Sequence, residues 1–431
     1  MQSTKTTKKQ QNSPGVFKKF FRWLYQLISK SFRWLHHFYL RYLYKRDTIL
    51  ATISVFLVIG LLGLIPINTG ILNPFKTALK DLDFNDIAYS VLKKNKGTSV
   101  DNRIVVVNIG GADRTGLALM IEKLRMAKPK VIGLDVEFNG AREPVQDSLL
   151  RHMVGSTPEL VIASRLDWQN KTEPLDPGYF GIFTKNTGYV NLIGEDGGTI
   201  RYFSPFEKAN SKLYKSFPVA IAEKANKEAF QHLQQRKRAY EVIHYSRTID
   251  QYIVLNGEDV LLDNIAPELL KDKIVLMGYI NPDPYNVEDK HYTPLNKKFA
   301  GKSTPDMNGI IVHANIISMI LDRQYIREIP TWLFWIITIL IAWLHVALFM
   351  RYYIEDHIWF HLVAKLAQIF FAILSVYVGI IFFDWFSIKI DTKISLIVII
   401  LAIDIIYFYE ALAVWLHTKF GFHTNFHSKA H

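Results

Sequence analysis

Short apolar runs alternate with helical repeats through the middle of the chain. Residues 104–109 (IVVVNI) form an almost wholly apolar run closed by Gly110 and Gly111, which is typical of a strand buried on both faces. Apolar residues at helical spacing follow as far as Pro129, and residues 131–136 form a second run of the same kind. This succession predicts a βαβ unit whose two strands are parallel.

The same patterns continue across residues 67–330. Residues 273–279 (KIVLMGY) predict another buried strand, and residues 309–321 predict an apolar helix. Residues 188–205 alternate on both sides of a glycine-rich turn at 195–198, which predicts an antiparallel hairpin. The predicted fold class is therefore α/β, a mostly parallel sheet sandwich with one antiparallel hairpin.

Four apolar stretches flank this region and have the length of membrane spans. They cover residues 48–66, 331–350, 360–383 and 394–416, one before the α/β region and three after it. The first lacks the short apolar core and small-residue cleavage site of a signal peptide, so we expect an uncleaved anchor. An even number of spans predicts that both termini lie on one side of the membrane, with residues 67–330 exported to the other.

Positive charge is concentrated before the first span. The net charge is +12, and residues 1–47 contribute +10 of it (eleven Lys and Arg, one Asp). The positive-inside rule therefore predicts cytoplasmic termini, including a tail at 417–431, and nucleic-acid binding has little support elsewhere. Residues 1–15 form a polar tail predicted to be disordered. Residues 16–47 predict a basic amphipathic helix that lies on lipid or packs on the protein's own spans; its lipid-contact candidates are Lys18, Lys19, Arg22, Lys30 and Arg33.

Three ionisable residues lie inside the predicted spans. At 1.5 Å per residue, Lys365 and Glu410 fall at similar depths from the cytoplasmic boundary, so they can form an ion pair. Equally, Lys365 could snorkel to the interface while Glu410 is protonated in lipid. Asp404 lies deeper, with no basic residue expected at its level. It is therefore predicted to be protonated or to face a partner subunit.

The candidate ligand-binding residues follow predicted strands. Asp135 and Glu137 lie at the carboxyl end of a strand, where ligands bind in open α/β sheets, although they could equally anchor a loop. Arg201, after the hairpin turn, could bind an anion or brace the turn. Asp283, Asp289 and His291 follow the strand at 273–279. They could hold a divalent cation, but their spacing matches no standard site and favours an ordered, hydrogen-bonded loop.

No catalytic constellation emerges from the sequence. Gly110 and Gly111 lack the G-x-G-x-x-G spacing of a dinucleotide site, and no Ser/His/Asp set or Walker-type loop is present. His313 stands alone on an apolar helix and is expected to be a satisfied core histidine. The chain has no cysteine, which excludes disulfides and thiolate chemistry. We therefore expect no enzymatic activity, no cofactor and no metal site.

Five segments in order resemble the type-two CHASE domain, a sensory domain of bacterial receptors. They are RIVVVNI, KVIGLDVEF, NTGYVNLIGEDGGTIRYFSP, DKIVLMGYINPDPYNVEDKHYTP and GIIVHANIISMIL. The resemblance implies a multi-pass protein of the bacterial inner membrane, with a periplasmic sensory domain that binds an unknown small ligand. It would be a stand-alone form without an output domain, signalling to a separate membrane or cytoplasmic partner. The alternative function is a structural or assembly component of a cell-envelope complex.

Overall fold

The chain divides into two compact units, the helical unit and the sheet unit. The helical unit comprises Met1–Asn68, Pro330–Val376 and Asp391–His431, and the sheet unit comprises Thr69–Ile329 and Tyr377–Ile390. The computed structural model describes residues 43, 45–64, 83–89, 99–167, 169–170, 174–194, 198–209, 211–281, 283, 286–296, 304–354 and 360–426. The amphipathic helix predicted at 16–47 and its five lipid-contact candidates lie almost wholly outside these residues.

A mostly parallel sheet forms the centre of the sheet unit, as the sequence predicted. Its parallel strands are, in order, β10 (Ile253–Asn256), β1 (Ile104–Asn108), β11 (Ile274–Gly278), β2 (Val131–Leu134), β3 (Leu160–Leu166) and β5 (Thr187–Tyr189), and β4 (Leu175–Asp176) pairs antiparallel with β3. The two strands of the predicted βαβ unit, β1 and β2, are parallel, but they are not neighbours. Instead β11 lies between them and pairs with both.

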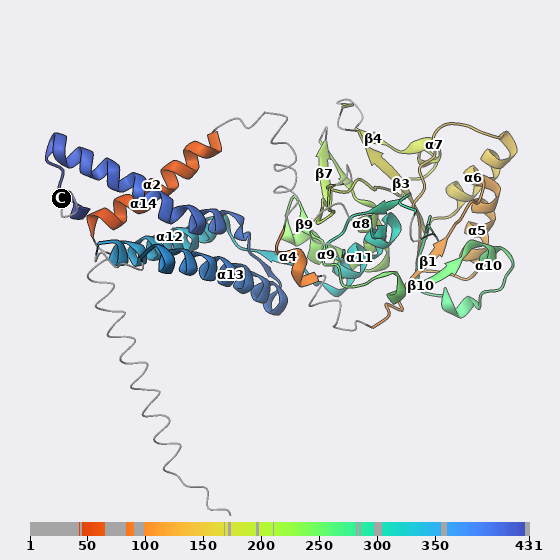
Figure 1. Ribbon diagram of the computed structural model, residues 1–431. Helices are drawn as coiled ribbons and strands as arrows, with labels where there is room; N and C mark the ends of the chain where they lie inside the picture. Colours follow the sequence, from red (N-terminus) through yellow and green to blue (C-terminus); the bar gives the residue numbers. More distant parts are fainter. Residues whose placement is uncertain are drawn as a thin grey trace, which may run out of the picture. The chain divides into compact units, whose positions relative to one another are not determined.

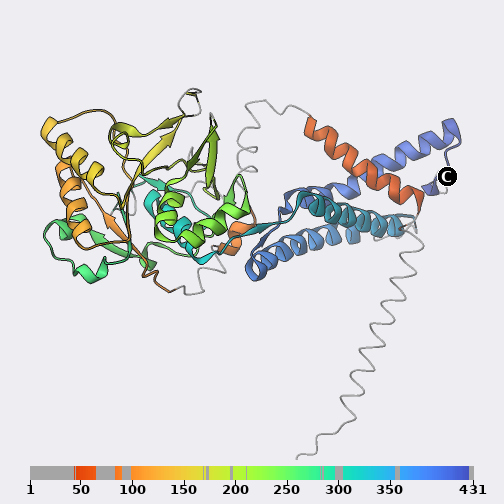
Figure 2. The same ribbon diagram turned by 180° about the vertical axis from the view of Figure 1, so that it is seen from behind.

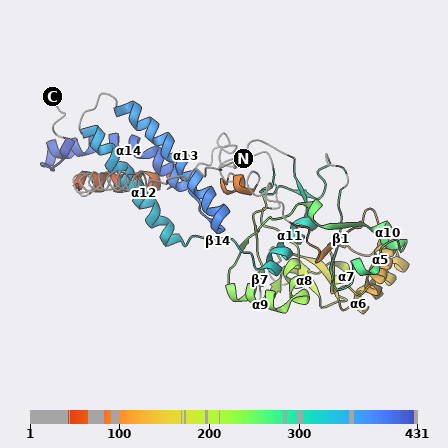
Figure 3. The ribbon, with the colours of Figure 1, turned by 90° about the horizontal axis from the view of Figure 1, so that it is seen from below.

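Helices cover both faces of this sheet (Figures 1 and 3). One face carries α5 (Arg114–Met126), α6 (Pro144–Ser156) and α10 (Gly257–Leu261); the other carries α8 (Phe217–Ala225), α9 (Lys227–Arg236) and α11 (Gly309–Asp322). Successive side chains of β1 alternate between the two cores. Val106 packs toward α11 and Val107 toward α5, each fully buried. Burial of each such side chain stabilises the fold by roughly 1.5–3 kcal/mol.

Two glycines allow the start of α8 to approach the sheet closely. A Cβ at Gly133 in β2 would lie 2.5 Å from Ile221 Cδ1 and 3.0 Å from Phe217 Cζ, and one at Gly188 in β5 would lie 2.5 Å from Phe217 Cα. The Phe217 ring in turn meets His313 of α11 edge to face, with 5.4 Å between ring centroids. These contacts fix α8 and α11 beside each other over β2.

The hairpin predicted at residues 188–205 is wrong in its strand pairing. Its first half contributes β5 to the parallel sheet, beside β3. Its second half contributes β6 (Tyr202–Phe203), which pairs with β9 (Glu241–Val242). Between the two halves the described residues form a single antiparallel bridge, Ile193 to Tyr202. Alternation alone cannot distinguish a hairpin strand from a parallel edge strand. A regular antiparallel hairpin lies just after it, formed by β7 (Phe206–Ala209) and β8 (Lys212–Lys215).

Four helices in the described residues are long and apolar enough to cross a membrane, in agreement with the four predicted spans. They are α2 (Arg46–Leu64), α12 (Thr331–Ile354), α13 (Phe360–Phe386) and α14 (Thr392–Phe420), and Figure 2 shows α2 crossing α14. Small residues, including Ala51 of α2 and Ala342 of α12, are fully buried in their shared core. Close approach of helices through small residues is typical of packing in membranes.

The connector between α13 and α14 belongs to the sheet unit. Residues Tyr377–Ile390 group with that unit, and they include the end of α13 and the short strand β15 (Ile388–Lys389). This strand pairs in parallel with β14 (Arg327–Glu328), which precedes α12. The sheet unit is therefore built from two parts of the sequence, one before the second span and one after most of the third.

Candidate functional site

Asp135 lies at the carboxyl end of β2, where the sequence predicted a ligand-facing side chain. Its backbone N–H donates to the carbonyl of Met277 in β11 at 2.8 Å, so the residue is fixed between two central strands. Side chains alternate along a strand, and Asp135 shares the face of Val131 and Gly133, which is the face that α8 and α11 cover. Its carboxylate is consequently directed toward α11.

The loop after β11 brings Asp289 and His291 to the start of α11. Strand β12 (Lys290–His291) pairs antiparallel with β13 (Met307–Asn308), which leads directly into that helix. A Cβ at Gly309 would lie 3.4 Å from His291 Nε2 and 3.6 Å from Asp289 Oδ1. Both side chains therefore lie against the first residue of α11. We call Asp135, Asp289, His291 and His313 the strand-end site.

His313 completes this site, contrary to the expectation of a satisfied core histidine. Its Nε2 lies 3.9 Å from Asp135 Oδ2, beyond hydrogen-bonding distance. Its Nδ1 is buried and has no hydrogen-bond partner among the described residues. Burial, and then the neighbouring His291, lower the pKa of His313 to about 3, so the ring is neutral. A neutral imidazole carries one N–H, and here neither nitrogen has an acceptor within reach.

The two carboxyls of the site favour protonation. Burial, and then the charges of Asp289 and Glu137, together raise the pKa of Asp135 to about 7. Burial, and the charge of Glu288 after it, raise the pKa of Asp289 to about 6, although the Gly309 N–H opposes this. Carboxyl groups held in this way favour a proton, or a ligand that brings positive charge or hydrogen-bond donors.

The other predicted ligand residues have different partners. Glu137 Oε1 accepts from Arg165 Nη1 at 2.7 Å, and both side chains are nearly half exposed. Arg201 Nη2 lies 2.6 Å from Asp86 Oδ2. Burial raises the pKa of Asp86 to about 6 despite this hydrogen bond, so Arg201 braces a buried acid. Asp283 is exposed, and its carbonyl accepts from Lys290 Nζ at 2.7 Å.

Backbone and side-chain hydrogen bonds order the described part of the loop that carries Asp283, Asp289 and His291. Within the ranges that the structure describes, no group of three or more His, Asp or Glu is placed to hold a metal ion. The loop is instead held by backbone pairing between β12 and β13 and by the bond from Lys290. This matches the ordered, hydrogen-bonded loop that the spacing favoured.

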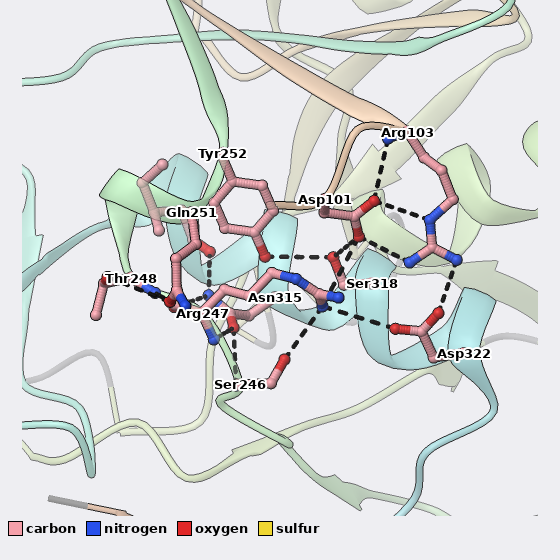
Figure 4. Close-up of polar contacts among 11 residues, drawn as sticks. Asp101, Arg103, Ser246, Arg247, Thr248, Gln251, Tyr252, Asn315, Ser318 and Asp322 are labelled. Carbon is pink, nitrogen blue, oxygen red and sulfur yellow. Dashed lines mark hydrogen bonds and ion pairs between the residues drawn. The ribbon is translucent and has the colours of Figure 1, made fainter. Parts of the chain in front are cut away.

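Sequence reasoning missed a second polar cluster, at the amino end of β1 (Figure 4). The buried Asp101 carboxylate accepts from Arg103 at 2.7 Å and from Ser318 Oγ at 2.8 Å, and Arg103 also pairs with Asp322 at 2.7 Å. Burial alone would raise the pKa of Asp101, but these hydrogen bonds outweigh it and hold the pKa at about 2. Arg247 Nη1 lies 3.7 Å from the same carboxylate. We call this cluster the Asp101 network.

The helical unit contains two polar contacts that the sequence did not predict. Lys365 Nζ lies 3.6 Å from Asp404 Oδ1, so the expectation that Asp404 has no basic residue at its level is wrong. Depth counted along each helix from its own end does not fix how α13 and α14 are offset, and this contact places Lys365 level with Asp404. Separately, Asp47 is buried at the start of α2 and accepts from Tyr409 Oη at 2.8 Å and from the backbone N–H of Asn425 at 2.7 Å.

Comparison with known proteins identifies one family. A family model described as the CHASE2 domain matches residues 48–350, from the first span through most of α12. No curated protein and no solved structure matches the chain. The matched residues include the entire strand-end site and the Asp101 network.

Proposed function

The chain belongs to the CHASE2 domain family, and from this premise we propose that it is a sensory membrane protein that binds a small ligand at the strand-end site. The sheet unit lies outside the cytoplasm and both termini lie inside. The four candidate spans support this orientation, together with the eleven Lys and Arg of residues 1–47. The membrane is the bacterial inner membrane, and the sheet unit is periplasmic.

The ligand carries a positive charge or several hydrogen-bond donors. Asp135 and Asp289 supply carboxylate acceptors at one end of the sheet, and Glu137 and Glu288 add negative charge that acts on them. A small organic cation would relieve the repulsion between these carboxylates. It would not satisfy His313, because the imidazole N–H needs a hydrogen-bond acceptor and a cation is a poor one. A ligand bearing both an amine and an acceptor would also engage the imidazole N–H.

The observation that carries the proposal is the buried His313 beside Asp135, two polar groups that face each other at 3.9 Å without a bond. A buried polar group without a partner costs about 1–3 kcal/mol. Proteins retain such groups at sites where a ligand completes the hydrogen bonds. The bound state then reaches a separate membrane or cytoplasmic partner, which converts it into a signal.

Thermal unfolding of the full chain in detergent tests ligand binding. We expect methylammonium and ethanolamine at pH 8 to raise the unfolding midpoint relative to sodium chloride of equal ionic strength, because ligands that bind the native state stabilise it. Asp135→Asn should abolish the increase, whereas Asp263→Asn, an exposed acid far along the sequence, should preserve it. Equal increases in parent and Asp135→Asn would contradict the proposal. No increase, with stoichiometric co-purification of an envelope complex, would favour the assembly function.

Cysteine labelling tests the orientation, because the native chain contains no cysteine. Val145→Cys introduces a thiol at a position of the sheet unit that is 74% exposed, and Phe420→Cys does so at the end of α14, which is 68% exposed. A membrane-impermeant maleimide added to intact spheroplasts should label only the first. Labelling of residue 420 before permeabilisation would reverse the proposed orientation.

A further inference from the structure

The connector between the third and fourth spans carries a buried lysine that binds the sheet unit. Lys389 in β15 is only 9% exposed. Its Nζ lies 2.7 Å from Asp83 Oδ2 and donates to the Tyr202 hydroxyl at 2.6 Å. Burial alone would lower the pKa of Lys389, but Asp83 and Tyr202 outweigh it and raise the pKa, so the side chain remains charged. The ion pair with Asp83 and the hydrogen bond to Tyr202 join the connector to two distant segments of the sheet unit.

Several other contacts make this connector an integral part of the sheet unit. Its strand β15 pairs with β14, and Arg327 N–H donates to the Ser387 carbonyl at 2.8 Å. Phe383 is 1% exposed and meets Tyr89 edge to face, with 5.1 Å between ring centroids. Apolar side chains in place of both Lys389 and Asp83 would serve simple anchoring at least as well, since replacing a whole buried ion pair by packed apolar residues is often neutral or stabilising. The charge is therefore better explained by a contact that changes.

A short path of backbone bonds connects the strand-end site with Lys389. Tyr292 follows His291 directly, and its carbonyl accepts from Ile200 N–H at 2.8 Å. Two residues later in the same segment is Tyr202, whose hydroxyl accepts from Lys389. Arg201, between them, binds Asp86. Residues 199–202 thus contact the loop at residues 291–292 at one end and the connector at the other. The ion pair between Arg201 and Asp86 lies between these two contacts.

We propose that Lys389 transmits the state of the strand-end site to the spans. A ligand held by Asp135 and His291 shifts the loop at 291–292. The shift passes through residues 199–202 and changes the contact of Tyr202 and Asp83 with Lys389. Because the connector continues directly into α13 on one side and α14 on the other, a displaced β15 must move the ends of both helices. The inference rests on the proposed function, and it assigns the route by which binding becomes a signal.

A fluorophore at the connector measures this transmission. Trp385 is 71% exposed near the end of α13, so Trp385→Cys provides a single labelling position for a polarity-sensitive dye on the full chain in nanodiscs. The input is Asp135→Asn, which removes the charge at the strand-end site without requiring a ligand. We expect Asp135→Asn to shift the dye emission in the parent background. The shift should fall at least fivefold in Lys389→Met and remain in Lys212→Met, an exposed lysine of β8.

Tyr202→Phe provides a milder test should Lys389→Met fail to fold. It keeps the buried ring and removes only the hydroxyl that binds Lys389, and we expect it to weaken the emission shift at least twofold. An emission shift of parental size in either folded variant would overturn the proposal. So would the absence of any shift on Asp135→Asn in the parent. Both results are independent of the methylammonium experiment, so failure of the route and failure of ligand binding are distinguishable.

Discussion

The two ends of helix α11 contact polar clusters that differ in how completely they are paired. At its amino end, His313 and Asp135 face each other at 3.9 Å without a hydrogen bond. At its other end, Ser318 and Asp322 join the Asp101 network, in which the buried carboxylate accepts from both Arg103 and Ser318. A nearly completed network stabilises the fold, whereas groups that face each other without a hydrogen bond are available for a ligand.

The two aspartates illustrate the same difference through their proton affinity. Asp101 precedes β1 and has its pKa held at about 2 by donors, whereas Asp135 follows β2 and has its pKa raised to about 7 by burial and neighbouring acids. Both residues lie at ends of central strands. What differs is the supply of donors, since the described neighbours that act on the Asp135 carboxyl are acids and the neutral His313 rather than arginines.

Removing the Asp101 carboxylate from the Asp101 network should have the largest effect on the free energy of unfolding. Asp101→Asn leaves Arg103 and Arg247 without their buried counter-charge, and removing one member of a buried pair costs about 3 kcal/mol or more. We expect this loss at pH 7 in urea unfolding of the full chain in detergent. The stabilisation from Asp101 should be present above its unfolded pKa of about 4 and be lost as pH falls toward 2. A loss under 1 kcal/mol would mean that the network is not structural.

Removing charge from the unpaired end should stabilise the protein. The folded-state pKa of Asp135 lies above the unfolded value, so its stabilising contribution is present below pH 4 and is lost as pH rises through about 7. Asp135→Asn should therefore increase the free energy of unfolding by about 3 kcal/mol at pH 8 and by little at pH 4. The same urea series at both pH values measures this. Destabilisation at pH 8 would contradict the assignment of an unpaired, desolvated carboxylate.

The exposed ion pair beside the strand-end site should contribute least to the free energy of unfolding. Arg165 and Glu137 form an exposed pair, and such pairs contribute less than about 1 kcal/mol. Arg165→Met and Glu137→Gln should each change the unfolding free energy by no more than this, with opposite small effects on methylammonium binding because they change the local charge in opposite directions. A loss above 2 kcal/mol for either variant would place the pair inside the site's structural core.

Local patterns were sufficient for the parallel sheet and for part of the site. Continuous apolar runs such as 104–109 predict buried strands because both faces of the sheet are covered, and the rule for strand ends then selects Asp135. The predictions failed where the structure depends on which strands pair with each other. Gly188 and Tyr189 have the same alternation in a hairpin as in a parallel edge strand, and only the close approach of Phe217 to Gly188 distinguishes them.

Long-range polar contacts leave no local signal. Ser318 and Asp101 are 217 positions apart, and Lys389 and Tyr202 are 187 apart, so neither spacing nor composition relates them. His313 was assigned to the core correctly by its apolar neighbours, but a helix pattern does not report whether a ring nitrogen has an acceptor. The level of Asp404 relative to Lys365 was misassigned because depth counted along single helices does not report the offset between α13 and α14.

The buried carboxylate of Asp47 has a consequence for how the protein is made. Its partners Thr424 and Asn425 are translated 377 and 378 positions after Asp47 itself. During synthesis, α2 is therefore made long before these two partners of the acid at its start. A truncated product lacking Thr424 and Asn425 would leave the Asp47 carboxylate without those hydrogen bonds. We expect membrane proteases to degrade such a product faster than the parent.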